Sequence, residues 1–193
     1  MPFLLGKCPV EERGDCMSNT EPNLHPNTGV SGYDLVGRGM TQWRRERPDI
    51  DCTGKAVVGR ILALQDMILK TVNAALAPYG LRYPAYAVLA TLRAAGRPYR
   101  LSPSQLQATM LFTSGGISNL IARVEKQGYV RRATDPSDKR GVRVELTRKG
   151  VDVVDRAMVD HAAAERQLCA MLSGPEQDTL AALLSRMIVL NGP

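Results

Sequence analysis

The hydrophobic pattern of this 193-residue chain changes abruptly at Gly128, and this change constrains the fold more than any other feature. Before Gly128, apolar residues recur at three- and four-residue spacing, as on one face of an α-helix. After it, segments 129–133 and 142–146 alternate with a period of two, which predicts the strands of a β-hairpin. The pattern therefore predicts a mainly α-helical protein with one small hairpin.

Two short helices are predicted just before the hairpin. Residues 102–105 (SPSQ) form a capping box with proline at the first helical position, so a helix is expected from there to about Thr109. After a three-residue connection, Thr113 is a good N-cap for a second helix, expected from Ser114 to Gln127. Two short helices joined by a tight turn form a helix-turn-helix. A hairpin directly after this motif has the position of a wing.

The second of these helices has a core-like inner face and an unusual outer face. Apolar residues recur at i, i+3, i+4 and i+7 on the inner face, namely Ile117, Leu120, Ile121 and Val124. The outer face is small and hydrogen-bonding: Ser114, Gly115, Ser118, Asn119, Ala122 and Arg123. Small side chains allow a helix to enter the major groove of DNA, where serine and asparagine reach base edges. The alternative is an ordinary amphipathic surface helix, on which we would expect more Glu and Lys.

Positive charge is concentrated in the segment that contains both motifs. The whole chain has a net charge of +6, whereas residues 97–150 carry 11 basic and 4 acidic groups, or +7. A concentrated positive field attracts a polyanion, and DNA is the commonest one. A solvated basic face without a partner is the alternative that charge alone leaves open.

The predicted contacts with double-stranded DNA come from three places: the N-cap of the first short helix, the second helix and the hairpin. At the tip of the hairpin, arginine is favoured against phosphates or in a minor groove. The predicted contact residues are Ser102, Thr113, Ser114, Gly115, Ser118, Asn119, Arg123, Lys139, Arg140 and Arg143.

Helices are also predicted on both sides of this central segment. Apolar periodicity, caps and stops predict them at about 33–47, 53–77, 84–95, 147–172 and 173–190. Residues 1–32 contain four prolines and a polar run without a helical period, which predicts a disordered tail. With no run of 18 apolar residues and no signal peptide, the chain is predicted to be cytoplasmic and free of the membrane.

Residue types that support catalysis or metal binding are scarce. The four cysteines form no CxxC pair, and His25 and His161 are the only histidines, so no zinc site and no cofactor are predicted. No set of nucleophile, base and orienting group is visible, which argues against an enzyme. Cys52 lies near a helix start, where a thiolate can be stabilised, so a redox-sensing regulator stays an alternative.

The hairpin and its flanks resemble the wing signature of the MarR family of transcriptional regulators. The matching runs are residues 128–132 (GYVRR), 135–147 (DPSDKRGVRVELT) and 149–150 (KG). The resemblance extends from about Thr53 to Leu190. It implies a winged helix-turn-helix homodimer that binds a pseudo-palindromic operator, with Asp138 orienting a wing arginine through a charge-assisted pair.

The same resemblance implies a division of the chain. One MarR-type domain is expected at 33–190. Within it, residues 33–80 and 148–190 are expected to supply dimerisation helices, and residues 81–147 the winged helix-turn-helix region.

A narrower resemblance is to the PecS/HucR-like, urate-responsive branch of this family. It is carried by residues 42–49 (QWRRERPD), 76–81 (LAPYGL) and 98–103 (PYRLSP). The branch implies a urate site made of a tryptophan, an aspartate and two arginines. Trp43 matches the tryptophan and Arg132 one arginine, whereas Ala87 occupies the aspartate position and Leu120 the other arginine position.

Because two of the four polar anchors are missing, we expect a different small anion. An aromatic or heterocyclic acid would stack on Trp43 and pair with Arg132. Trp43 as a packing anchor, Tyr83 in the core and Asp66 in solvent are the structural alternatives. The predicted ligand-binding residues are Trp43, Asp66, Tyr83, Ala87 and Arg132.

These patterns together predict a sequence-specific DNA-binding transcriptional regulator. We expect a repressor that a small anionic aromatic ligand releases from its operator. A winged-helix module that binds protein or structured RNA is the alternative.

Overall fold

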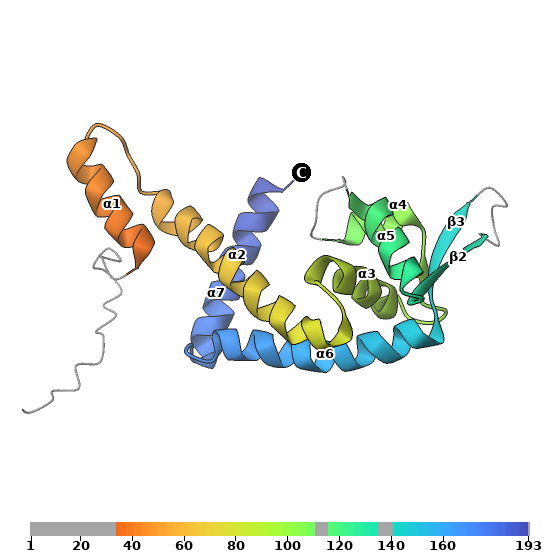
Figure 1. Cartoon of the computed structure of the whole chain (residues 1–193). Helices are drawn as coiled ribbons and strands as arrows, with labels where there is room; N and C mark the ends of the chain where they lie inside the picture. Colours follow the sequence, from red (N-terminus) through yellow and green to blue (C-terminus); the bar gives the residue numbers. More distant parts are fainter. Residues whose placement is uncertain (1–33, 111–115, 135–140, 193) are drawn as a thin grey trace, which may run out of the picture. The chain divides into compact units, whose positions relative to one another are not determined.

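The computed structural model describes residues 34–110, 116–134 and 141–192, and most of them are helical (Figure 1). The chain divides into two units, residues 1–56 and 57–193. The described part contains a three-stranded antiparallel sheet beside the helices. The predicted mainly helical class with a small hairpin is confirmed.

The first unit contains the added N-terminal helix, α1 (Leu35–Glu46). It begins at Asp34, whose side chain accepts a hydrogen bond from the Gly37 amide at 2.7 Å, and it ends one residue before Pro48 would interrupt it, at the C-cap Arg47. Trp43 is 45% exposed on this helix, with the Lys55 ammonium 5.8 Å from its ring centroid.

The core of the second unit is built around α3 (Tyr83–Ala94), which packs against α4 (Pro103–Thr109) and α5 (Ile117–Lys126). The first turn of α3 has a proline, and its Tyr83 amide donates to the side chain of Asn73 at 2.8 Å. Apolar residues from these helices meet in one buried cluster: Val88, Leu89, Leu92, Leu106, Ile121 and Val124.

The hairpin has the predicted strands, β2 (Val130–Thr134) and β3 (Val142–Leu146), paired from Val130–Leu146 to Thr134–Val142. A third strand, β1 (Arg100–Leu101), pairs with the other edge of β3. The sequence analysis missed β1, because a two-residue strand has no period of its own and forms only through its partner.

Long helices flank this core in the sequence. They are α2 (Lys55–Leu76), which continues as the 3₁₀ turn Ala77–Tyr79, α6 (Arg148–Cys169) and α7 (Gly174–Asn191). Figure 1 shows α6 running from the hairpin to α7, and α3 packs against it. Thr147 is the N-cap of α6, as predicted, accepting from the Gly150 amide at 3.0 Å.

The predicted start of the second helix of the helix-turn-helix is wrong. The helix α5 begins at Ile117 with Gly116 as its N-cap, three residues later than predicted. The physical reason is the pair of glycines at 115–116, which have about 1 kcal/mol less helix propensity each than alanine. The N-cap of α5 is therefore Gly116 and not the predicted Thr113.

Candidate nucleic-acid interface and adjoining cavity

The exposed face of α5 carries the polar residues that the sequence places there. Ser118, Asn119 and Arg123 are exposed, while Ile121 and Val124 on the opposite face are buried. Within the described residues, the side chains of these three polar residues make no hydrogen bond. Asn119 and Arg123 border a shallow recess of about 350 Å³ together with Pro84, Gly116 and Leu120. This face is free to bind an external group.

The helix α4 is linked to the hairpin through one amide oxygen. Gln105 Oε1 accepts from the Ser102 amide at 2.9 Å, which completes the predicted capping box, and from Arg143 Nη1 at 2.8 Å. Ser102 Oγ in return accepts from the Gln105 amide at 3.1 Å. The structure therefore places two predicted DNA contacts, Ser102 and Arg143, at one joint between helix and wing.

Two more arginines of the hairpin lie in ion pairs. Arg131 is 3.1 Å from Glu145 on β3, and Arg132 is 3.1 Å from Glu125 on α5. Both arginines are exposed, so each pair contributes about 0–1 kcal/mol. Arg132, predicted to bind an acidic ligand, thus already has a carboxylate partner.

Several predicted contacts lie outside the described residues. They are Thr113, Ser114 and Gly115 before α5, and Asp138, Lys139 and Arg140 in the hairpin loop. For these residues the assignments remain predictions.

The C-terminal end of α5 is held by the first turn of α6. Lys149 Nζ donates to the Gln127 carbonyl at 2.9 Å, and Thr147 Oγ1 donates to the Gly128 carbonyl at 2.7 Å. Gly150 packs so closely that a Cβ atom there would overlap the Tyr129 carbonyl oxygen. We call these contacts the α5–α6 joint. These contacts connect the end of α5 to the start of α6.

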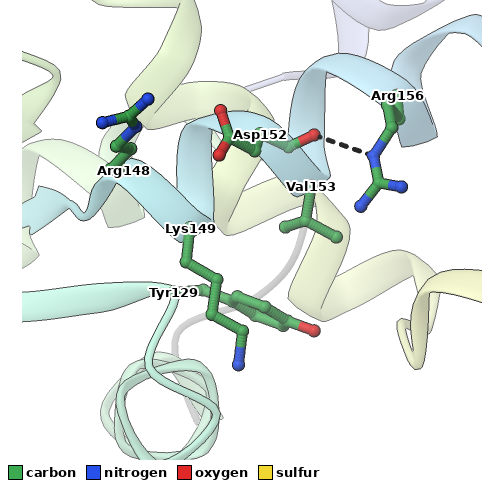
Figure 2. A pocket seen from close by; sticks show the side chains of 6 residues that line it. All are labelled: Tyr129, Arg148, Lys149, Asp152, Val153 and Arg156. Carbon is green, nitrogen blue, oxygen red and sulfur yellow. Dashed lines mark hydrogen bonds between the residues drawn. The ribbon is translucent and has the colours of Figure 1, made fainter.

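A basic recess of about 420 Å³ lies beside this joint (Figure 2). Tyr129, Arg148, Lys149, Asp152, Val153 and Arg156 line it. Two of its three cations already have intramolecular partners, since Lys149 Nζ lies 5.0 Å from the Tyr129 ring centroid and Arg156 Nε donates to the Asp152 carbonyl at 3.2 Å. The recess adds to the positive field of this end of the molecule.

A second, smaller cavity lies between α3, the end of α4 and α6. It measures about 180 Å³ and is lined by Tyr83, Tyr86, Ala87, Ala90, Thr91, Thr109, Met110 and His161. Burial raises the pKa of the Tyr83 and Tyr86 phenols, and the charge of Glu165 raises both further. Both phenols are therefore neutral near neutral pH.

The predicted ligand-binding residues do not all line one cavity. Tyr83 and Ala87 line the same cavity. Asp66 is exposed on α2, and Arg132 lies on β2 beside Glu125, so neither borders the cavity. Trp43 belongs to the first unit, where its ring lies near the Lys55 ammonium.

Comparison with known proteins gives the family of this chain. Residues 79–141 match the model of the MarR family. The chain is 32% identical to the HTH-type transcriptional regulator PecS of Dickeya dadantii over 158 aligned residues. This alignment covers 82% of this chain and 95% of PecS. The chain belongs to the MarR family.

Solved structures have the same fold as this MarR-family chain. Sco3205, a MarR family regulator from Streptomyces coelicolor solved in complex with DNA, is 28% identical, with a TM-score of 0.65 over 72% of this chain and 89% of that chain. A mutant of MarR from E. coli, solved with operator DNA, is 23% identical, with a TM-score of 0.62 over 76% and 97% of the two chains. The resemblances to the MarR family and to its PecS-like branch are confirmed.

Other expectations have more limited support. The curated relatives of this chain are transcriptional regulators. No helix in the described ranges is long and apolar enough to cross a membrane. In the part of the chain that the structure covers, no three His, Cys, Asp or Glu side chains cluster as a metal site would require. Cys52 is half-buried and Cys169 exposed, and both thiols are free, so the redox alternative stays a prediction.

Sequence reasoning missed two residues of this MarR-family site. Gln105 was recognised as part of a cap, but its bond to Arg143 joins residues 38 positions apart. His161 lines the cavity, which its sequence neighbours alone do not indicate. Its position in the apolar stripe of α6, four residues after Ala157, was the one available signal.

Proposed function

We propose that this MarR-family chain is a sequence-specific regulator of transcription that binds double-stranded DNA as a homodimer. The observation that carries the proposal is the exposed, small and polar face of α5 on a buried core. Ser118 and Asn119 have the size and hydrogen-bonding groups that read base edges in a major groove. The names of the curated relatives, which are HTH-type transcriptional regulators, support the same role.

The remaining contacts would position the protein on the DNA backbone. Arg123 follows Asn119 by one helical turn and is exposed, so it suits a phosphate or a guanine. The predicted wing residues Lys139 and Arg140 would reach phosphates or the minor groove beside it. Ser102, Thr113, Ser114, Gly115 and Arg143 remain proposed contacts.

A second copy of the chain is the proposed partner of the flanking helices. α2 and α7 expose many large apolar side chains, which a monomer in water rarely does over a contiguous area. The side chains proposed to form the interface are Val57, Val58, Leu62, Leu64, Met67 and Ile68 on α2, and Leu180, Leu183, Met187, Ile188 and Leu190 on α7. Two copies would place two α5 helices in successive major grooves, about 10 base pairs apart on a pseudo-palindrome.

The cavity beside α3 is the proposed effector site. A small aromatic ligand bound there would contact α3, which packs on both α5 and α6. The ligand would release DNA only if it bound the conformation that does not fit the operator more tightly. The proposed protein is therefore a repressor released by a small aromatic molecule.

Footprinting on the chain's own promoter, followed by fluorescence polarisation, tests this proposal. Arg123→Ala is expected to weaken binding to the footprinted site by about tenfold or more, because one phosphate or base contact is lost. Arg166→Ala, an exposed arginine near the other end of α6, is the matched control and should bind like the original chain. Affinity should also fall steeply with salt. Weak binding without sequence preference would instead favour a module for protein or structured RNA.

A further inference from the structure

The turn between α2 and α3 contains a motif that takes no part in the proposed contacts with DNA or ligand. Its residues are 76–81 (LAPYGL). The motif continues α2 as a 3₁₀ turn and ends at Gly80, whose φ of 65° lies in the left-handed region that favours glycine. The turn lies in the sequence between a flanking helix and the core helix α3, so its polar groups are placed to hold other elements in position.

Polar groups of Tyr79 and Gly80 contact three other elements. The Tyr79 hydroxyl donates a hydrogen bond to Asp160 Oδ2 on α6. The Tyr79 carbonyl accepts a long hydrogen bond of 3.4 Å from the Tyr129 hydroxyl, next to β2, and the Gly80 carbonyl accepts one of 3.2 Å from Gln127 Nε2 at the end of α5. We call these three bonds the Tyr79 bridge. It connects α6 to the end of α5 and the start of β2 through two consecutive residues.

The bond to Asp160 is the strongest of the three, because a carboxylate acceptor makes it charge-assisted. This bond also raises the pKa of the Tyr79 phenol, so the hydroxyl keeps its proton and stays a donor near neutral pH. The other two bonds are accepted by backbone carbonyls. A substitution at residue 79 that deletes only the hydroxyl therefore removes the bond to Asp160 alone.

The exposure of this bond separates its effect on orientation from its effect on stability. The hydroxyl and the carboxylate meet at the surface, where polar pairs contribute little to the free energy of unfolding. The core beneath them is held by apolar packing. Losing the bond would therefore leave the unit folded but allow α5 a wider range of angles to α6.

We propose that Tyr79 is a positioning residue for the DNA-reading helix α5, which it holds in register with α6 through Asp160. The proposal rests on the proposed DNA-binding function and goes beyond it, since Tyr79 itself does not touch DNA. Contacts with base edges need α5 in one orientation, whereas phosphate contacts supply affinity for any sequence. The hydroxyl therefore contributes to the preference for the operator and not to general affinity for DNA.

Tyr79→Phe tests the proposal, because it keeps the ring and deletes the hydroxyl. Fluorescence polarisation gives the Kd for the footprinted operator and for a scrambled duplex of equal length. The preference, the ratio of the two Kd values, should fall about three- to tenfold, as expected for one lost hydrogen bond. The Kd for the scrambled duplex, the sedimentation coefficient and the midpoint of urea unfolding should stay the same. An unchanged preference, or an equal loss on both duplexes, would overturn the proposal.

Substitutions at Asp160 show whether the hydrogen bond itself is responsible. Asp160→Asn keeps an oxygen that accepts from the hydroxyl and should retain the preference, whereas Asp160→Ala should lower it as Tyr79→Phe does. Both variants remove the same negative charge, which strengthens binding to every duplex alike, so the preference isolates the hydrogen bond. The double variant Tyr79→Phe/Asp160→Ala should be no worse than either single variant. Fully additive losses would contradict the proposal.

A measurement without DNA distinguishes this inference from the proposed function. By hydrogen exchange, the backbone amides at the end of α5 should exchange faster in Tyr79→Phe than in the original chain. If they do so in a chain that binds no operator, the bridge holds α5 but the DNA-binding function fails. If the original chain binds its operator and Tyr79→Phe changes neither the exchange nor the preference, the DNA-binding function stands and the role of Tyr79 fails.

Discussion

At the scale of single residues, Gly150 is the position with the least freedom. The α6 backbone approaches the Tyr129 carbonyl so closely there that no side chain fits, and Gly150 also donates its amide to Thr147 Oγ1. Its role is therefore steric rather than conformational. Two other helical glycines, Gly39 and Gly174, have open space where a Cβ would lie.

Gly150→Ala is expected to destabilise the fold by about 1–3 kcal/mol, because overpacking moves α6 away from the end of α5. Urea denaturation measures the free energy of unfolding. Gly174→Ala, in the first turn of α7, is the matched control and should change stability by less than about 0.5 kcal/mol. If both variants unfolded alike, the close contact at Gly150 would not have the importance given to it here.

At the scale of elements, the wing and the helix-turn-helix are joined by Gln105. This one side chain closes the cap of α4 and accepts from Arg143 on β3. Arg143 can therefore support DNA binding in two ways, by touching DNA itself or by orienting the hairpin against α4.

A double-mutant cycle separates the two roles of Arg143. Arg143→Ala should weaken operator binding, and the loss should be smaller by about 0.5–1.5 kcal/mol when Gln105 is already alanine, because the two side chains share one hydrogen bond. Fluorescence polarisation on all four proteins gives the coupling. Strict additivity would instead mean that Arg143 acts directly on DNA.

At the scale of the whole molecule, the apolar face of α7 needs a partner. None of the helix's described residues is buried. Leu180, Leu183 and Met187 follow one another at three- and four-residue spacing, on one face. Val189 is nine residues after Leu180, which puts it on the opposite face.

Leu183→Glu is therefore expected to convert a dimer into a monomer and to weaken operator binding, because a single copy holds only one half-site. Sedimentation velocity measures the assembly. Val189→Glu introduces the same charge on the other face and should leave the dimer intact. Were Leu183→Glu to remain fully dimeric, the proposed interface would not include this stripe.

The parts of the fold that were predictable from sequence are those with local signals. The capping box at Ser102 and the alternation of β3 are visible in a few neighbouring residues, and both are confirmed. Contacts between distant segments have no such signal. The strand β1, the bond from Gln105 to Arg143 and the stacking of His161 on Tyr86 all join residues more than 35 positions apart. The start of α5 at Ile117 differs from the prediction, because the local N-cap signal at Thr113 takes no account of the low helix propensity of glycine.

The α5–α6 joint has a geometric consequence. Because these contacts connect the two helices, a change in the tilt of α6 is expected to displace the end of α5. With 22 residues α6 is about 33 Å long, so a tilt of about 5° about its far end displaces the joint by about 3 Å. This approaches the rise of one base pair along a duplex, about 3.4 Å. A tilt of a few degrees in α6 would thus be enough to put two copies out of step with the helical repeat of DNA.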